Sequence, residues 1–358
     1  MKYTRAVSIP FPSWTQTVLL AASLVWVAQA SLAADESAKP HGEFRGALPT
    51  EYPAWFKESF LDFHEDIQEA AQEGRRMAIL FHQDGCPYCN FLVERNFAQR
   101  DIETYARKHF DFVALNMWGD REVVPVNGET YSEKELAAAL KVQYTPTLMF
   151  FDERGQVALR VDGYLPPARF KHALKYVAEK RESEVAYHEY MAAFAPKGKT
   201  NTPLNAQPFF MPTPLDMTTR DVNKPYVLLF EQKDCPSCDA LHRDVLDLPE
   251  TRELLGAFDV AQVDMWSESS IRDSLGRVVS AKALANGLKI SYAPTMVLFD
   301  ADGREVIRAD GFFHRFHIQS IIDYVKTKAH QHEPSFQRYI SERAEAFQEK
   351  GIDVDLLN

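Results

Sequence analysis

One nine-residue pattern occurs twice in this chain, and it constrains the fold more than any other feature. The first copy, FHQDGCPYC, spans residues 81–89, and the second, FEQKDCPSC, spans residues 230–238. Each copy follows a short apolar run and precedes a segment that is compatible with a helix. The two copies contain the only cysteines of the chain, which are Cys86, Cys89, Cys235 and Cys238. Because every thiol lies in a Cys-Pro-x-Cys pair, the pattern indicates thiol–disulfide chemistry.

The repeat extends well beyond the cysteines. With a shift of 148 residues, Met117-Trp118 aligns with Met265-Trp266, and Asp162-Gly163 aligns with Asp310-Gly311. Between residues 132–163 and 280–311, 15 of 32 positions are identical. A repeat of this size is longer than the roughly 20–50 residues of solenoid repeats. The chain therefore contains a duplicated domain.

The first 34 residues resemble a secretory signal peptide. Lys2 and Arg5 are their only charges, residues 18–28 are an apolar run of 11 residues, and Ala28-Gln29-Ala30 is a possible cleavage site. An apolar run of this length is short for a membrane-spanning helix, although an uncleaved N-terminal anchor is the alternative. We expect the mature protein to be exported, most simply to a bacterial periplasm. Cleavage changes the net charge from −11 to −13, which argues against nucleic acid or an anionic membrane as a partner.

Each copy predicts the same alternation of strands and helices, and therefore an α/β domain with a partly parallel sheet. In the first copy we expect strands at 77–81, 110–117, 147–151 and 157–161. We expect helices from Pro53, after Cys86, and at 102–109, 132–142 and 170–177. This gives a first domain with an appended helix at 47–195, a proline-rich linker at 196–214, and a second domain at 215–345 with a helical tail to residue 358. We expect the linker aromatics Phe209 and Phe210 to pack on one domain.

The arrangement resembles the thioredoxin family. Besides the two cysteine pairs, the residues that carry the resemblance are Thr145-Pro146 and Ala293-Pro294, which open later strands 60 and 59 residues after the first cysteine of each pair. More narrowly, the chain looks like periplasmic SoxW-type thioredoxin-related proteins. The resemblance implies two tandem thioredoxin-like domains, each with a central mixed sheet flanked by helices. It also implies that Pro146 and Pro294 are cis and that the backbone at Thr145 and Ala293 pairs with a substrate chain.

The position of the cysteines at the start of a helix assigns them different roles. Unpaired N–H groups and the helix dipole stabilise a thiolate there, so we expect Cys86 and Cys235 to attack disulfides. Cys89 and Cys238, one turn later, would resolve the mixed disulfides. The two sites should differ, because Tyr88 in one corresponds to Ser237 in the other.

One position departs from the family pattern. The buried acid that the family usually carries six residues before the first cysteine is replaced by Leu80 and Leu229. His82, Asp84, Glu231 and Asp234 are nearer to the cysteines. They could take over the role of this acid, but we expect them to form a polar rim, and the identity of the proton acceptor stays open. Trp118 and Trp266 could flank the active-site face, but we expect each to be a partly buried packing residue.

The sequence therefore predicts an exported thiol–disulfide oxidoreductase without a cofactor other than its redox-active disulfides. Its partners would be thiols and disulfides of exported proteins, with a membrane electron donor if it is a reductase. The alternatives are a disulfide oxidase or isomerase and a non-catalytic binding or chaperone module. A four-cysteine zinc site is disfavoured, because 149 residues separate the pairs and each pair belongs to its own domain. The redox direction, the client proteins and the oligomeric state stay open.

Overall fold

Two four-stranded mixed sheets form the centres of two domains in the computed structural model, which describes residues 41–194 and 203–358. The predicted signal peptide and the start of the linker lie outside the described residues. Domain 1 has the strand order β3-β2-β6-β7. Its strands are β2 (Arg76–His82), β3 (Phe110–Asn116), β6 (Thr147–Phe151) and β7 (Val157–Asp162). The pair β2–β3 is parallel, and the pairs β2–β6 and β6–β7 are antiparallel.

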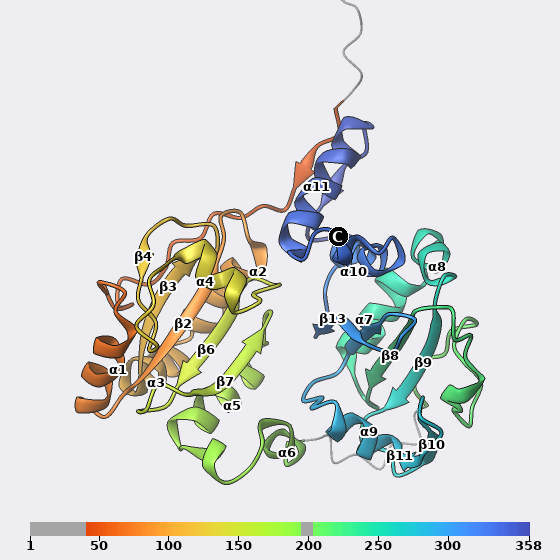
Figure 1. Cartoon of the computed structure of the whole chain (residues 1–358), viewed down its shortest axis with the longest axis horizontal. Coiled ribbons are helices and arrows are strands. Elements are labelled where there is room, and N and C mark those ends of the chain that lie inside the picture. The colour runs from red at the N-terminus through yellow and green to blue at the C-terminus, as the bar shows by residue number, and fades with distance from the viewer. Residues whose placement is uncertain (1–40, 195–202) are drawn as a thin grey trace, which may run out of the picture.

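Domain 2 repeats this sheet with the order β13-β12-β8-β9. Its strands are β8 (Tyr226–Glu231), β9 (Asp259–Asp264), β12 (Thr295–Phe299) and β13 (Glu305–Asp310). In both domains the central strand is buried along nearly its whole length, because helices cover both faces of the sheet (Figure 1). The predicted fold, two thioredoxin-like domains with mixed sheets flanked by helices, is confirmed.

Helices α2 to α6 of domain 1 recur in the same order as α7 to α11 of domain 2, whereas a short 3-10 helix at Met217–Thr219 stands before β8 where α1 stands before β2. Domain 1 contains α1 (Phe63–Gln72), α2 (Pro87–Phe91), α3 (Arg100–His109), α4 (Glu133–Ala139), α5 (Pro167–Ala178) and α6 (Tyr187–Ala192). Domain 2 contains α7 (Pro236–Leu241), α8 (Pro249–Leu255), α9 (Ala281–Gly287), α10 (Arg315–Lys326) and α11 (Phe336–Glu349). A π-helical turn extends both α2 and α7, at Leu92–Phe97 and His242–Leu246. Among the described residues, no helix is long and apolar enough to cross a membrane.

One local expectation was wrong. The first helix begins at Phe63 rather than near Pro53, because the Asp62 side chain caps it by accepting hydrogen bonds from two backbone N–H groups of the first turn. Phe60, which fitted the helical periodicity, is fully exposed. The polar excursion after Trp118 contains a small hairpin, β4 (Glu122–Val123) with β5 (Tyr131–Ser132), and domain 2 has its counterpart in β10 (Ser270–Arg272) and β11 (Val278–Ser280).

The linker aromatics pack on domain 2. Phe210 forms an isolated bridge with Val260 of β9, and the Met211 N–H donates to the Val260 carbonyl oxygen at 2.8 Å. The Phe210 ring also contacts His242, with ring centroids 5.8 Å apart. The end of the linker is therefore an added edge of the second sheet.

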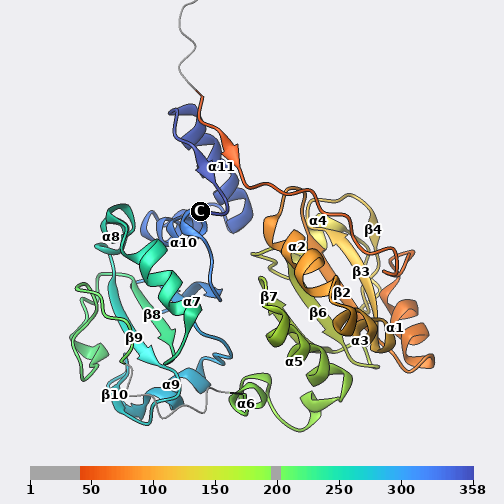
Figure 2. The same cartoon turned by 180° about the vertical axis from the view of Figure 1, so that it is seen from behind.

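The two ends of the described chain meet beside domain 1. Strand β1 (Phe44–Arg45) pairs in parallel with β14 (Val354–Asp355), which follows α11. We call this pairing the terminal clasp. Figures 1 and 2 show β1 and α11 lying together at one end of the molecule, above the two domains. Leu48, a few residues after β1, donates its N–H to the carbonyl oxygen of Gly85, in the loop that precedes Cys86.

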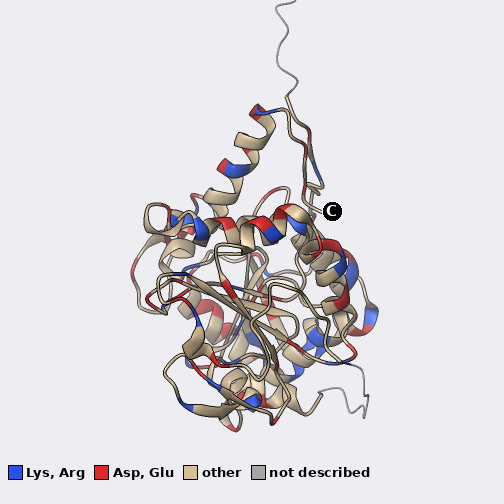
Figure 3. Ribbon diagram, turned by 90° about the vertical axis from the view of Figure 1, so that its right-hand side faces the viewer, with Lys and Arg blue, Asp and Glu red and all other residues tan. Residues whose placement is uncertain are grey.

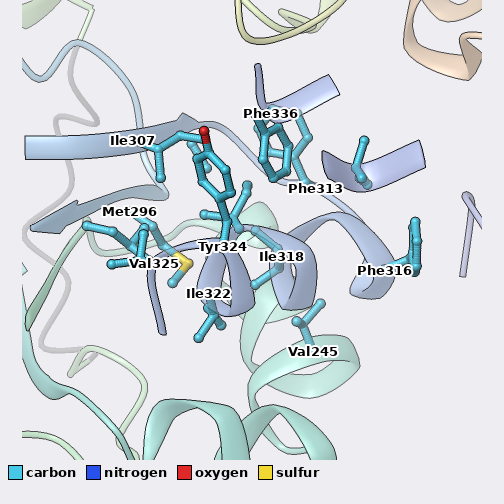
Figure 4. Packing of buried hydrophobic residues seen from close by; sticks show 14 of the residues in the cluster. Val245, Met296, Ile307, Phe313, Phe316, Ile318, Ile322, Tyr324, Val325 and Phe336 are labelled. Carbon is cyan, nitrogen blue, oxygen red and sulfur yellow. The ribbon is translucent and has the colours of Figure 1, made fainter. Parts of the chain in front are cut away.

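A single hydrophobic cluster joins the two domains. Its members from domain 1 are Cys86, Tyr88, Cys89 and Tyr144, and its members from domain 2 include Phe313, Phe316, Tyr324 and Phe336. Figure 4 shows Phe313, Tyr324 and Phe336 within the part of this cluster that belongs to domain 2. Lys, Arg, Asp and Glu are distributed over the helices of both domains (Figure 3). The domains are therefore joined by apolar burial at the first cysteine pair.

Asp310, at the end of β13, provides a pH-dependent contribution to this interface. Burial raises the pKa of its carboxyl to about 6, with Asp162 raising it further and Arg308 opposing the shift. Because the folded pKa lies above the ordinary value of 3.8, its contribution to stability is complete below pH 4 and is lost as the pH rises through 6. Asn at this position keeps an acceptor for the Thr295 hydroxyl, which donates to Asp310 at 3.1 Å.

We therefore expect Asp310→Asn to raise the free energy of unfolding at pH 8 by up to about 3 kcal/mol, since a shift of about two pKa units is worth about 2.7 kcal/mol. At pH 4 the variant and the parent should be equally stable. Urea unfolding at both pH values measures the difference, and Asp302→Asn, at an exposed turn of the same domain, is the control. An equal effect of Asp310→Asn at both pH values would contradict this account.

Candidate active sites

Each cysteine pair lies where a central strand ends and a helix begins. Cys86 is the N-cap of α2 and Cys235 the N-cap of α7, with the proline at the first helical position. The Cys89 N–H donates to Cys86 Sγ at 3.0 Å, and the Cys238 N–H donates to Cys235 Sγ at 3.1 Å. Such donors stabilise a thiolate at the first cysteine of the pair. We call Cys86–Cys89 site 1 and Cys235–Cys238 site 2.

Both pairs are oxidised and face a cis-proline. The disulfides join Cys86 to Cys89 and Cys235 to Cys238, with Cα atoms 5.3 and 5.1 Å apart. The Thr145–Pro146 and Ala293–Pro294 peptide bonds are cis, as the resemblance implied. Cys86 Sγ lies 3.4 Å from the Thr145 carbonyl oxygen, and Cys235 Sγ lies 3.7 Å from the Ala293 carbonyl oxygen. The structure therefore brings the predicted residues of each site together.

Domain 2 covers site 1. Tyr88, between the two cysteines, is 5% exposed, and Cys86 and Cys89 are 4% and 0% exposed. The Tyr88 ring contacts Phe313 and His317, with centroids 5.4 and 5.2 Å apart, and its hydroxyl accepts a hydrogen bond from the His314 N–H at 3.1 Å. This burial raises the pKa of the Tyr88 hydroxyl. Sequence reasoning missed the contact, because its two sides are more than 220 residues apart.

The start of α11 occupies the backbone edge beside the first cis-proline. The Phe336 N–H donates to the Gln143 side chain at 2.8 Å, and the Gln337 side chain donates to the Gln143 carbonyl oxygen at 3.0 Å. The Gln143 side chain in turn donates to the Pro334 carbonyl oxygen at 3.1 Å. Residues 334–337 thus lie against Gln143, two residues before Thr145.

A tryptophan and a glutamine flank each site. The Trp118 indole N–H donates to the Gln83 side chain at 2.8 Å, and the Trp266 indole N–H donates to the Gln232 side chain at 2.9 Å. At site 1, Gln83 also donates to Gln337 of α11 at 2.7 Å. The two tryptophans are therefore not only packing residues, because each one orients a glutamine next to a cysteine motif.

Site 2 has a more open rim than site 1. Lys233, Asp234 and Pro236 are exposed, and Ser237 is half-buried, whereas Pro87 and Tyr88 at the equivalent positions of site 1 are buried. Cys235 itself is 6% exposed, so the sulfur environments are similar and the difference lies in the surrounding surface. The two sites were expected to differ because Tyr88 corresponds to Ser237. They also differ in how exposed the residues around the cysteine pair are.

A family model described as a thioredoxin-like domain matches residues 63–178 and again residues 217–326. The chain belongs to the thioredoxin-like domain family. Solved structures with a similar fold include a thioredoxin-fold protein from Helicobacter pylori, a thioredoxin from Thermus thermophilus and a DsbH oxidoreductase. They are 17%, 21% and 19% identical, and the matches cover 36%, 39% and 37% of this chain and 83%, 89% and 92% of theirs. The TM-scores are 0.31, 0.26 and 0.26. A comparison with curated protein sequences gave no match.

The polar residues near the thioredoxin-like sites do not all form a rim. Asp84 and Asp234 are exposed, as expected, but Glu231 is 1% exposed. Its carboxylate contacts His242 Nε2 at 3.1 Å and accepts a hydrogen bond from Gln262 at 2.5 Å. Domain 2 therefore buries a carboxylate at the end of its central strand, four residues before Cys235, and the expectation of an exposed rim was wrong for this residue.

In domain 1 the position of Glu231 is taken by His82. Its ring lies 4.4 Å from the ring of Tyr52, and burial lowers the pKa of His82 to about 4. His82 is therefore neutral at physiological pH. The two central strands thus end in different groups, four residues before the first cysteine of each site. Domain 2 has a buried carboxylate paired with a histidine, and domain 1 has a neutral histidine against an aromatic ring.

The arrangement supports thiol–disulfide oxidoreductase activity in general, because each thioredoxin-like domain has a Cys-x-x-Cys pair at a helix start. Each pair is bonded within its own domain, so the four sulfurs do not form one tetrahedral metal site. Within residues 41–194 and 203–358, no group of three or more potential ligands could hold a metal ion.

Proposed function

We propose that the protein is an exported thiol–disulfide oxidoreductase that reduces disulfides of other periplasmic proteins. The observation that supports this most directly is the repeated site: a Cys-Pro-x-Cys pair at a helix N-terminus, with the first sulfur within 4 Å of the carbonyl oxygen that precedes a cis-proline. This places a nucleophilic sulfur next to a backbone edge on which an extended client chain can pair.

The proposed reaction proceeds by two exchanges. The thiolate of Cys86 or Cys235 attacks a client disulfide, forms a mixed disulfide and releases one client thiol. The thiolate of Cys89 or Cys238 then attacks the first cysteine and releases the second client thiol. The client gains two electrons and two protons, and the enzyme is left with its own disulfide. Thr145-Pro146 and Ala293-Pro294 would hold the client backbone during the attack.

Three further parts of the proposal rest on the sequence. The basic and apolar character of residues 1–34 supports export, and the likeness to SoxW-type proteins favours reduction over oxidation. A membrane electron donor would re-reduce the disulfides after each cycle.

The open rim of site 2 makes it the better candidate for contact with protein clients.

We expect the mature protein to catalyse the reduction of insulin by dithiothreitol, and each pair to equilibrate with glutathione redox buffers. A reduction potential near or below about −270 mV would support the reductase, whereas values of about −180 to −120 mV would indicate an oxidase or isomerase. Two full-length variants separate the sites: Cys235→Ser with Cys238→Ser leaves only site 1, and Cys86→Ser with Cys89→Ser leaves only site 2.

The variant in which all four cysteines are serine is the control for background reduction. If neither pair exchanges with glutathione and insulin reduction does not exceed this background, the oxidoreductase proposal is wrong. The non-catalytic binding module would then take its place.

A further inference from the structure

A cavity of about 320 Å³ lies over the first cysteine of site 1. Domain 1 contributes the Cys86 motif and the segment before the cis-proline, and domain 2 contributes residues of α10 and α11. Cys86 is among the lining residues, whereas Cys89 is completely buried. The cavity also reaches the exposed residues Phe44, Asp84 and Trp118, so it opens to solvent on that side.

Two buried polar atoms of the lining have no hydrogen-bond partner among the described residues. They are the Tyr144 hydroxyl and Nδ1 of His317. The His317 ring packs against Tyr88, and the Tyr144 ring packs against Phe313 with ring centroids 5.5 Å apart. Buried polar atoms are nearly always satisfied in folded proteins. Both atoms are buried behind the surface of the cavity, so it is the position of the cavity over Cys86 that makes this sulfur accessible to a small ligand.

The size of the cavity favours a small molecule over a protein chain. Small-molecule sites usually measure about 300–1,000 Å³, and this one is at the lower limit. An extended client would need the backbone at Thr145, and residues 334–337, which bind Gln143 two residues earlier, narrow the approach to it. In this conformation Cys86 is more accessible to a small molecule than to a polypeptide.

The charge of the lining restricts the ligand further. Asp84 is its only Asp, Glu, Lys or Arg residue, and burial lowers the pKa of His317 to about 3, so this histidine is neutral. A carboxylate at the opening and no basic residue in the lining disfavour a ligand with net negative charge.

We propose that site 1 exchanges with a low-molecular-weight disulfide or thiol that carries no net negative charge, such as cystine, through this cavity. The proposal rests on the proposed oxidoreductase function and assigns a substrate class to one of its two sites. The Cys86 thiolate attacks the small disulfide RSSR, forms Cys86–S–S–R and releases one RSH. The Cys89 thiolate then attacks Cys86, closes the protein disulfide and releases the second RSH. One RSSR thus gains two electrons and two protons and becomes two RSH, and the dithiol becomes a disulfide.

The test compares the reduced site-1-only and site-2-only full-length proteins by stopped-flow tryptophan fluorescence, with cystine, oxidised glutathione and insulin as oxidants. For each oxidant, the rate at site 1 is divided by the rate at site 2, which cancels the intrinsic reactivity of the oxidant. We expect this ratio to be at least about tenfold higher for cystine than for insulin, a difference equivalent to about 1.4 kcal/mol. The ratio for oxidised glutathione, which is anionic, should be lower than that for cystine.

A cavity-filling variant tests the route. Ser341 lines the cavity and is exposed on α11, so Ser341→Trp in the site-1-only protein should slow cystine exchange at least about tenfold. Glu342→Trp, at the neighbouring exposed position outside the lining, should not change it. In the site-2-only protein neither substitution should have an effect.

Three outcomes overturn the inference: no reaction of site 1 with cystine, similar ratios for insulin and cystine, or no effect of Ser341→Trp. All three leave the proposed function intact as long as site 2 reduces insulin. If site 2 also fails with every oxidant, the proposed function itself is wrong.

Discussion

Replacing Cys235 with serine is expected to lower the rate of insulin reduction by at least about 100-fold, because loss of a catalytic nucleophile typically costs several orders of magnitude. Cys86→Ser should retain at least about half of the rate, because site 1 takes little part in the reduction of a folded or extended protein. The physical reason is access. Lys233, Asp234 and Pro236 beside Cys235 are exposed, whereas α10 covers Tyr88 and the start of α11 binds Gln143 beside site 1. The measurement is turbidimetric insulin reduction with dithiothreitol.

The double variant Cys86→Ser with Cys235→Ser sets the background of this assay. Circular dichroism of each variant shows whether the fold is retained, since both cysteines are nearly buried. Equal losses for the two single variants would mean that α11 leaves site 1 readily in solution, and a larger loss for Cys86→Ser would reverse the assignment of the client-facing site.

Phe336→Ala should expose site 1. Phe336 is 0% exposed, lies at the start of α11, and contacts Tyr144 of domain 1 and Tyr324 of domain 2, with ring centroids 5.6 and 5.5 Å apart. Truncating a buried phenylalanine costs about 3–5 kcal/mol, and every 1.4 kcal/mol changes a population tenfold. If only part of this cost falls on the docking of α11, alkylation of the reduced site 1 by a polymer-linked maleimide should accelerate at least about tenfold.

Tyr187→Ala is the matched control, because the duplication provides one. Tyr187 of α6 packs on Tyr176 as Phe336 packs on Tyr324, with ring centroids 5.1 Å apart, but α6 covers no cysteine. This variant should not change the alkylation rate of site 1. Rapid alkylation of site 1 in the unmodified protein would contradict the closed state, and acceleration by both variants would show general destabilisation instead of release of α11.

Much of the fold was predictable because its determinants are local. Each of these determinants involves residues that are close together in the sequence. They are the apolar runs that become β2 and β8, the capping box of Ser132 and Glu135, and the proline that follows Cys86 and Cys235 at the first helical position. The duplication added a second, independent copy of the same information. The cis-prolines followed from the family resemblance and not from any local pattern.

The errors have physical causes as well. Phe56 and Phe60 have helical spacing, but Phe56 belongs to an aromatic cluster with Trp55, Phe97 and Phe112 in an irregular segment, and Phe60 packs on nothing. Glu231 was expected on the rim of site 2, and the partners His242 and Gln262, which come from other elements, accompany its burial. The covering of site 1 depends on Phe313 and Phe336, and no local pattern links these residues to Tyr88.

The terminal clasp joins residues about 310 positions apart, and α11 belongs to the last tenth of the chain. Domains fold as units during synthesis, beginning with the N-terminal one. While domain 2 is still being made, domain 1 can complete its sheet and its Cys86–Cys89 pair, but the segment that covers them does not yet exist. The contacts that α11 makes with site 1 can therefore form only after almost the whole chain has been made. The covering of site 1 is a late event in the assembly of the molecule, whereas the cysteine pair itself depends on residues that are made early.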